Sequence, residues 1–198
     1  MLIIEIIIAI FLVAAFLHFK ITKKNLNFKT TLLTDSLVAS DEIKRTLAMG
    51  LYLRFRRENE KDIHVVDDNA IFIKQDPITF ETFIAEVFES ARGGNTWVSP
   101  PSGDFGVDFE HNIGSNKYLG QVKCEKDDIS FDPIAILHSN MVKQNAKGGY
   151  VITTSAFTKS AKQYAEGLDI ELVDGMRLVE LWLDGIKKDE KEIKSLYN

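Results

Sequence analysis

The stretch GDFGVDFEHNIGSNKYLGQVKC, residues 103–124, decides the predicted fold of this chain. Two segments within it, Val107–His111 and Tyr118–Cys124, have the pattern of short β-strands. Between them lies Gly114-Ser115-Asn116, which consists of residues that favour turns. The stretch therefore predicts a hairpin of two antiparallel strands.

Three polar side chains are expected to meet on one face of this hairpin. Strand side chains alternate between faces, so Gln121 and Lys123 point the same way, and antiparallel pairing brings Asp108 close to them. Hydrolysis of a phosphodiester with a hard cation needs oxygen ligands for Mg²⁺ and an ammonium group near the attacking water. Asp108 would anchor the metal, Gln121 would offer a second oxygen, and Lys123 would orient water and offset charge on the phosphate. The alternative interpretation is that all three are solvated residues at strand ends.

Helices and strands alternate around this hairpin. A helix is expected to begin at Asp76-Pro77 and to end at Gly93-Gly94, with an apolar stripe along one side. The further strands expected are Trp97-Val98, Tyr150–Thr154 and Ile170–Val173, and the further helices are Asp132-Pro133 to Gly148-Gly149, Thr158–Glu166 and Met176–Leu183. This order predicts an α/β fold with a mixed sheet flanked by helices, in one domain with a single core.

Five short motifs, in order along the chain, carry a resemblance to a known family. The region from Phe80 to Leu183 resembles the Mrr-type restriction endonucleases, a branch of the PD-(D/E)xK nucleases. The matching segments are Phe80-Glu81, Gly103-Asp104-Phe105-Gly106-Val107-Asp108, Gln121-Val122-Lys123, Val151-Ile152-Thr153-Thr154 with Phe157 and Ala161, and Ile170-Glu171-Leu172-Val173-Asp174-Gly175.

The resemblance implies a restriction-endonuclease-like fold and assigns roles to four residues. Asp108, Gln121 and Lys123 would form the catalytic core, with Asp108 and Gln121 as ligands of Mg²⁺ or Mn²⁺. Glu81 would be a helper carboxylate, although a glutamate in the first turn of a helix is also explained by the helix dipole. The implied partner is double-stranded DNA, and the family's members commonly work as homodimers.

The chain lacks the excess of basic residues that is usual in proteins that bind nucleic acids. The 198 residues carry a formal net charge of −5, with a pI near 5.4. The segment after Lys123 is itself rich in acids, namely Glu125, Asp127 and Asp128. These acids would repel phosphate, but a local basic groove and a bound Mg²⁺ could offset them.

The amino terminus predicts one transmembrane helix. Residues from Leu2 to Phe19 are apolar except for Glu5 and His18, and the run is about the shortest that spans a bilayer. Lys20, Lys23 and Lys24 follow, and the positive-inside rule places the carboxyl-terminal domain in the cytoplasm, as in a single-pass membrane protein. The alternatives are a cleaved secretory signal, which would have basic residues before the run, and a buried helix of a soluble protein.

Between this helix and the nuclease-like region, the sequence predicts a connector with some structure. The predicted divisions are a transmembrane helix and basic flank over 1–24, a connector over 25–75, a nuclease domain over 76–185 and a charged tail over 186–198. A connector helix begins at Ser40 and runs toward Phe55, and Ile63–Lys74 has the pattern of a hairpin. The basic cluster of Arg54, Arg56 and Arg57 could contact anionic lipid or nucleic acid, or form a solvated helix face.

The sequence therefore predicts a membrane-tethered, Mg²⁺-dependent DNA endonuclease that hydrolyses phosphodiester bonds by direct attack of water. Two alternatives remain: a nuclease-fold module that binds DNA or protein without catalysis, and a membrane-anchored structural component with no nucleic-acid partner. Cys124 is the single cysteine, the four histidines show no metal-ligand spacing, and no phosphate-binding Gly-x-x-x-x-Gly-Lys-Ser/Thr motif is present. These observations argue against a zinc site and against nucleotide hydrolysis.

Overall fold

The computed structural model describes residues 8, 10–25, 40–56, 79–100 and 105–196, in two compact units, Met1–Ser40 and Asp41–Asn198. In the first unit, residues 8 and 10–25 are helical, and their large apolar side chains are exposed. Part of the predicted transmembrane run, residues 2–7 and 9, lies outside the described residues. Within the described part of the chain, no helix has both the length and the apolar content needed to cross a bilayer.

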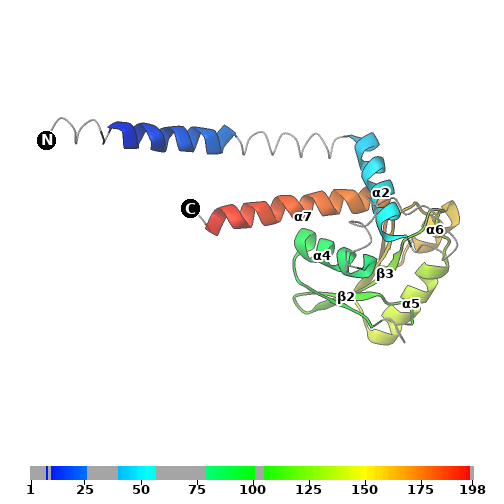
Figure 1. Ribbon diagram of the computed structural model, residues 1–198. Helices are drawn as coiled ribbons and strands as arrows, with labels where there is room; N and C mark the ends of the chain where they lie inside the picture. Colours follow the sequence, from blue (N-terminus) through cyan, green and yellow to red (C-terminus); the bar gives the residue numbers. More distant parts are fainter. Residues whose placement is uncertain (1–7, 9, 26–39, 57–78, 101–104, 197–198) are drawn as a thin grey trace. The chain divides into compact units, whose positions relative to one another are not determined.

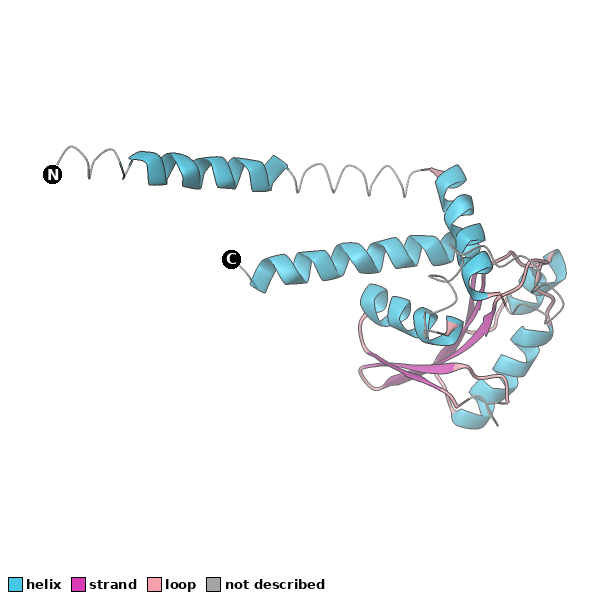
Figure 2. Cartoon of the chain, viewed as in Figure 1, coloured by secondary structure: helices cyan, strands magenta, loops and turns pink. Residues whose placement is uncertain are grey.

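The second unit is built on a five-stranded sheet (Figures 1 and 2). Its strands, in sheet order, are β1 (Asn95–Val98), β2 (Phe109–Ile113), β3 (Asn116–Lys123), β4 (Gly148–Thr153) and β5 (Ile170–Val173). β1, β2 and β3 pair antiparallel, whereas β3, β4 and β5 pair parallel. Ile113 pairs with Asn116 across a two-residue turn in which Gly114 has a positive φ of 60°. The predicted hairpin and the mixed α/β class are confirmed.

Helices cover both faces of this sheet. On one face, α4 (Phe80–Arg92) packs against the sheet and against α7 (Gly175–Leu196), and α2 (Asp41–Phe55) packs on α7. The opposite face carries α5 (Asp132–Gln144) and α6 (Lys159–Ala165). Alternation along β3 and β4 separates the two cores: Tyr118 and Tyr150 belong to an aromatic cluster under Phe88 of α4, while Leu119 and Val151 pack with α5 and α6.

The end of α5 differs from the prediction. The helix stops at Gln144 because Asn145 takes a left-handed conformation, with φ of 51°, and caps it. Gly148 and Gly149, which were expected to end the helix, instead begin β4. A Cβ on Gly149 would lie 2.8 Å from the sulfur of Met141, so this glycine lets α5 pack closely on the strand.

The ends of the other elements also shift. The start of the first predicted helix, Asp76-Pro77, and the predicted hairpin Ile63–Lys74 lie outside the described residues, and α4 begins after Thr79, whose hydroxyl accepts a hydrogen bond from the backbone N–H of Thr82. The predicted closing helix, Met176–Leu183, is longer: α7 continues to Leu196 through the predicted charged tail. Its lysines and glutamates are good helix formers, which explains the extension.

Candidate active site

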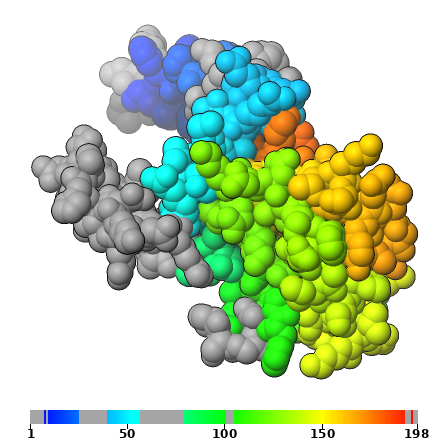
Figure 3. Space-filling model, turned by 90° about the vertical axis from the view of Figure 1, so that its right-hand side faces the viewer, coloured from blue at the N-terminus to red at the C-terminus, as the bar shows by residue number. Residues whose placement is uncertain are grey.

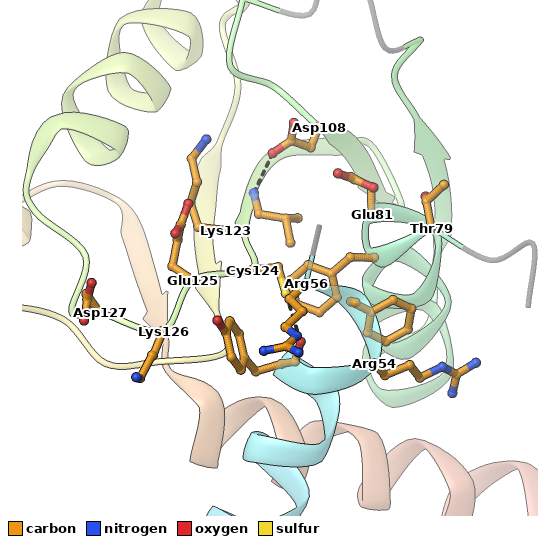
Figure 4. A pocket seen from close by; sticks show the side chains of 14 residues that line it. Arg54, Arg56, Thr79, Glu81, Asp108, Lys123, Cys124, Glu125, Lys126 and Asp127 are labelled. Atoms are coloured by element: carbon orange, nitrogen blue, oxygen red, sulfur yellow. Dashed lines mark hydrogen bonds between the residues drawn. The ribbon is translucent and has the colours of Figure 1, made fainter. Parts of the chain in front are cut away.

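A pocket of about 850 Å³ opens where four segments of the second unit meet (Figure 4). The segments are the carboxyl end of α2, the first turn of α4, the residue before β2, and the end of β3 with the loop that follows it. The lining residues are Tyr52, Arg54, Phe55, Arg56, Thr79, Phe80, Glu81, Asp108, Val122, Lys123, Cys124, Glu125, Lys126 and Asp127. Three of the four predicted catalytic residues are among them.

Asp108 is fixed by hydrogen bonds to β3. Its backbone N–H donates to the carbonyl of Gly120 at 2.8 Å, and its carboxylate oxygen Oδ2 accepts from the backbone N–H of Val122 at 2.6 Å. The residues on either side of Asp108 pack on opposite faces of the sheet: Val107 lies in the core under α5, whereas Phe109 contacts Phe88 of α4. The carboxylate is half-buried and held at the pocket wall.

Glu81 and Lys123 complete the predicted set that lines the pocket. Glu81 lies in the first turn of α4, and Figure 4 shows it at the same end of the pocket as Asp108. Lys123 ends β3 on the other side of the pocket, and both side chains are half-buried. The structure thus brings an acid pair and an ammonium group to one pocket, the arrangement that phosphodiester hydrolysis requires.

Gln121 is placed differently from the other three. It lies two residues before Lys123 in β3, as predicted, but it is only 3% exposed and does not line the pocket. A Cβ on Gly106 would lie 3.2 Å from its Nε2, so the amide packs under the turn before β2. Its Oε1 is buried and finds no hydrogen-bond partner among the described residues. Leaving such an oxygen unsatisfied costs about 1–3 kcal/mol.

The residues present fit a hard cation such as Mg²⁺ better than zinc. Among the described residues, no three His, Cys, Asp or Glu side chains are grouped to hold an ion by themselves. Magnesium is usually held by one or two carboxylates together with waters and substrate phosphates. Asp108 and Glu81, which line the pocket, would supply the two carboxylates. The unsatisfied oxygen of Gln121 is buried outside the pocket lining.

The loop after β3 is held by residues whose role the sequence did not indicate. The hydroxyl of Thr154 donates to the carbonyl of Glu125 at 2.9 Å, and the hydroxyl of Ser155 donates to the carbonyl of Asp127 at 2.8 Å. The backbone N–H of Thr154 also donates to the carbonyl of Lys123 at 3.3 Å. Thr154 and Ser155 therefore fix the backbone that follows Lys123, and the position of Thr154 in a matched motif was the available signal.

The sequence also did not indicate that α2 contributes to the pocket. The ring of Phe55 lies 5.2 Å from the rings of both Phe80 and Phe83 of α4, and the thiol of Cys124 donates to the carbonyl of Tyr52 at 3.8 Å. Figure 3 shows α2, in cyan, against the green segment that contains the end of β3. The sequence predicted a helix from Ser40 toward Phe55 but not the surface on which it packs.

The fold and the pocket define a mixed α/β domain in which two carboxylates and the lysine that ends the central strand line one pocket. Residues 73–182 match the family model Mrr_cat, described as restriction endonuclease, and this match covers more than half of the chain. The chain belongs to this family of restriction endonucleases, as the motifs had implied.

The chain is also similar to individual restriction enzymes. The type IV methyl-directed restriction enzyme EcoKMrr of Escherichia coli (strain K12) is 32% identical over 87 residues, which are 42% of this chain and 29% of the relative. Two solved structures are similar at lower identity. The MspJI restriction endonuclease in complex with a 27-mer oligonucleotide has a TM-score of 0.43 at 19% identity, covering 68% of this chain and 33% of that one. The DNA modification-dependent restriction endonuclease AspBHI has a TM-score of 0.49 at 17% identity, covering 73% and 40%. This chain thus spans less than half the length of each.

Proposed function

We propose that this protein is a Mg²⁺-dependent endonuclease that hydrolyses phosphodiester bonds of double-stranded DNA. One observation carries the proposal: Asp108, Glu81 and Lys123, which come from three separate segments of the family region, line the same pocket. The relative EcoKMrr is a restriction enzyme, which supports DNA as the substrate.

The residues of the pocket have distinct proposed roles. Asp108 and Glu81 hold Mg²⁺, with Gln121 as the third candidate ligand, and Mn²⁺ as a substitute ion. When bound, the ion supplies Lewis-acid polarisation of a phosphoryl oxygen. The hydrogen bond from Val122 to Asp108 keeps that carboxylate in a single orientation. Lys123 positions the attacking water and stabilises negative charge that develops on the phosphate.

Direct attack by water fits the remaining groups in the pocket. Among the side chains that line the pocket, the thiol of Cys124 is the type that would make the strongest nucleophile. Burial, however, raises the pKa of this thiol. A protonated thiol is a poor nucleophile. The reaction that these residues support is hydrolysis without a covalent enzyme intermediate.

The proposal includes a membrane tether and a dimer. The apolar run Leu2–Phe19, followed by Lys20, Lys23 and Lys24, supports a single-pass protein with its carboxyl-terminal domain in the cytoplasm. A dimer would supply a second site for the second DNA strand. Expression of the full chain followed by alkaline washing of membranes tests the tether, and release of the chain into the wash contradicts it.

The activity is tested with the purified full chain, kept in mild detergent because of its apolar amino-terminal helix. It is mixed with double-stranded DNA and Mg²⁺ or Mn²⁺, and Asp108→Asn is the critical variant because asparagine keeps an acceptor for the N–H of Val122. Asp184→Asn, an exposed acid on α7 outside the pocket, is the matched control. We expect cleavage by the wild type and by the control only. Cleavage that persists in Asp108→Asn would reject the assignment.

A second candidate is a nuclease-fold module that binds DNA or protein at the membrane without catalysis. The position of Gln121 favours it, because this predicted ligand is buried and does not line the pocket. This function predicts salt-dependent DNA binding that needs no metal, together with no cleavage by the wild type in either Mg²⁺ or Mn²⁺.

A further inference from the structure

The carboxyl end of α2 forms one wall of the candidate active site although it lies outside the family region. The family match begins at residue 73, whereas α2 spans Asp41–Phe55. Four residues at this end line the pocket, namely Tyr52, Arg54, Phe55 and Arg56. This wall is therefore a contribution of this chain beyond the part that it shares with the family model.

The wall changes the charge of the pocket. The described residues of the family region that line it carry four acids, Glu81, Asp108, Glu125 and Asp127, but only two bases, Lys123 and Lys126. Such a surface repels the phosphates of DNA. Arg54 of α2 and Arg56, which directly follows the helix, add two positive charges, so that the pocket is lined by four acidic and four basic side chains. Both arginines are exposed and can reach a ligand that enters from solvent.

Specific contacts fix α2 in this position. Lys44 is 7% exposed and pairs with Glu180 of α7 at 2.8 Å and with Asp41 at 3.0 Å. At the other end of the helix, Phe55 packs between Phe80 and Phe83 of α4. An ion pair that buries a lysine, together with an aromatic contact near the pocket, holds the helix end in one place. The backbone at this end of α2 is therefore fixed before a ligand binds, which lowers the entropy cost of binding there.

We propose that Arg54 and Arg56 bind backbone phosphates of the DNA that enters this pocket. A guanidinium group presents a planar fork of donors that matches phosphate oxygens, and its charge is unaffected by pH. The two arginines thus offset the negative charge that the acidic loop after Lys123 adds to the pocket. This inference rests on the proposed function, because it names the part of this chain that holds the same substrate.

Two simpler roles compete with this one. Basic side chains at the end of a helix stabilise its dipole, and arginines close to a membrane segment can contact anionic lipid headgroups. The shared pocket favours DNA over lipid, because the arginines line the same pocket as Asp108 and Lys123, the residues predicted to act on phosphate. Each competing role predicts a different measurement.

The test compares the full chain with Arg54→Gln/Arg56→Gln and with Arg45→Gln. Arg45 is an exposed arginine of the same helix that lies outside the pocket, so it controls for charge and for the stability of α2. DNA binding is measured in the presence of a chelator at several salt concentrations, and cleavage is measured in Mg²⁺. Each phosphate contact contributes about 0.9 to the slope of log affinity against log salt, so the double variant should lose a slope of about two. Its melting temperature should match that of Arg45→Gln.

The outcomes separate the inference from the proposed function. A wild type that binds and cleaves DNA, with an unchanged salt slope in the double variant, overturns the inference and leaves the nuclease intact. A wild type that neither binds nor cleaves rejects both. Loss of binding to vesicles that contain an anionic phospholipid, with DNA binding unchanged, assigns the arginines to lipid and also overturns the inference.

A conservative variant separates a phosphate contact from a role in helix stability. Its readout is the salt slope of DNA binding, which a role in helix stability alone would not alter. Arg54→Lys/Arg56→Lys keeps both charges but removes the planar forks. It should restore most of the salt slope, because that slope counts neutralised phosphates. Failure of the lysine variant to recover any slope, while Arg45→Gln remains normal, would show that the charge at these positions does not meet phosphate.

Discussion

The two ends of α4 use their charges in opposite ways. At the carboxyl end, Arg92 forms two hydrogen bonds to the carboxylate of Glu171, at 2.8 and 2.7 Å. Its guanidinium carbon also lies 4.7 Å from the ring centre of Phe88 and 4.9 Å from that of Tyr150. At this end, charge is neutralised by a specific partner and packed on aromatic rings.

At the amino end, charge faces a pocket. Glu81 and Lys123 form no ion pair with any other residue that the structure describes, and Asp108 is held at the same pocket by the backbone of β3. The comparison shows that one helix joins a structural ion pair to a candidate catalytic site. Substitutions at the two ends should therefore affect different properties of the molecule.

The largest effect is expected from Lys123→Met at the pocket end. Methionine keeps the length of the side chain but removes the ammonium group, so cleavage should fall by about 100-fold or more. The free energy of unfolding should change by less than about 0.5 kcal/mol, because no ion pair is lost. Cleavage rates and chemical denaturation are measured together, with Lys162→Met on exposed α6 as the control. A large loss of stability with normal cleavage would reverse the comparison.

Arg92→Met should give the opposite result. It removes both hydrogen bonds to Glu171 and leaves a partly exposed carboxylate without its partner. Because that carboxylate retains some water contact, the cost should be about 1–2 kcal/mol of unfolding free energy. Cleavage per folded molecule should remain normal. Arg177→Met, which breaks a more exposed pair with Glu180, should cost less than half as much.

A smaller effect concerns His111, which lies near the carboxyl end of α4. This side chain is fully buried, its Nε2 lies 2.7 Å from the carbonyl oxygen of Gly93, and its Nδ1 has no partner among the described residues. Burial lowers the pKa of His111, an effect that the nearby Arg92 reinforces, while the Gly93 carbonyl and Glu89 act in the opposite direction.

This pKa shift fixes the sign of the pH dependence. The unfolded chain binds a proton at His111 more readily than the folded chain, so the neutral histidine contributes stability above its ordinary pKa, near 6.5. That contribution is lost as the pH falls from about 6.5 toward the lower pKa of the folded state. Denaturation of the wild type and of His111→Gln between pH 7.5 and 5 should show a steeper loss in the wild type. Equal slopes would remove His111 from the explanation.

The strands were predictable because their signals are local. The turn residues between β2 and β3 and the apolar runs around them placed each strand within two residues. Alternation along the second strand predicts that Gln121 and Lys123 point the same way. Alternation does not predict, however, how deeply each side chain is buried. β3 is paired on both sides, by β2 and β4, so a residue within the strand is buried while one at its end reaches the pocket. That difference separates Gln121 from Lys123.

The wall formed by α2 was not predictable for a different reason. Its helix was expected, but its position depends on Lys44, whose partner Glu180 lies 136 residues away in the chain. A lysine within a helix is ordinarily solvated, and no local pattern indicates that it is buried against a distant glutamate. Contacts of this kind depend on the assembled fold, which is also why the role of Thr154 in holding the loop after β3 was missed.

Cys124, as the single cysteine, provides a probe of the pocket end. Burial raises the pKa of its thiol, so iodoacetamide should modify it at pH 8 more slowly in the folded chain than in urea. If DNA occupies the pocket, bound DNA should slow the reaction further. A second variant, Asn95→Cys in a Cys124→Ser background, moves the thiol to the start of β1, beyond the other end of α4. DNA should not change the reaction rate of this thiol, because Asn95 is exposed and outside the pocket. Equal protection at both positions would mean that DNA does not distinguish the two ends of the helix, and the pocket would lose its status as the DNA site.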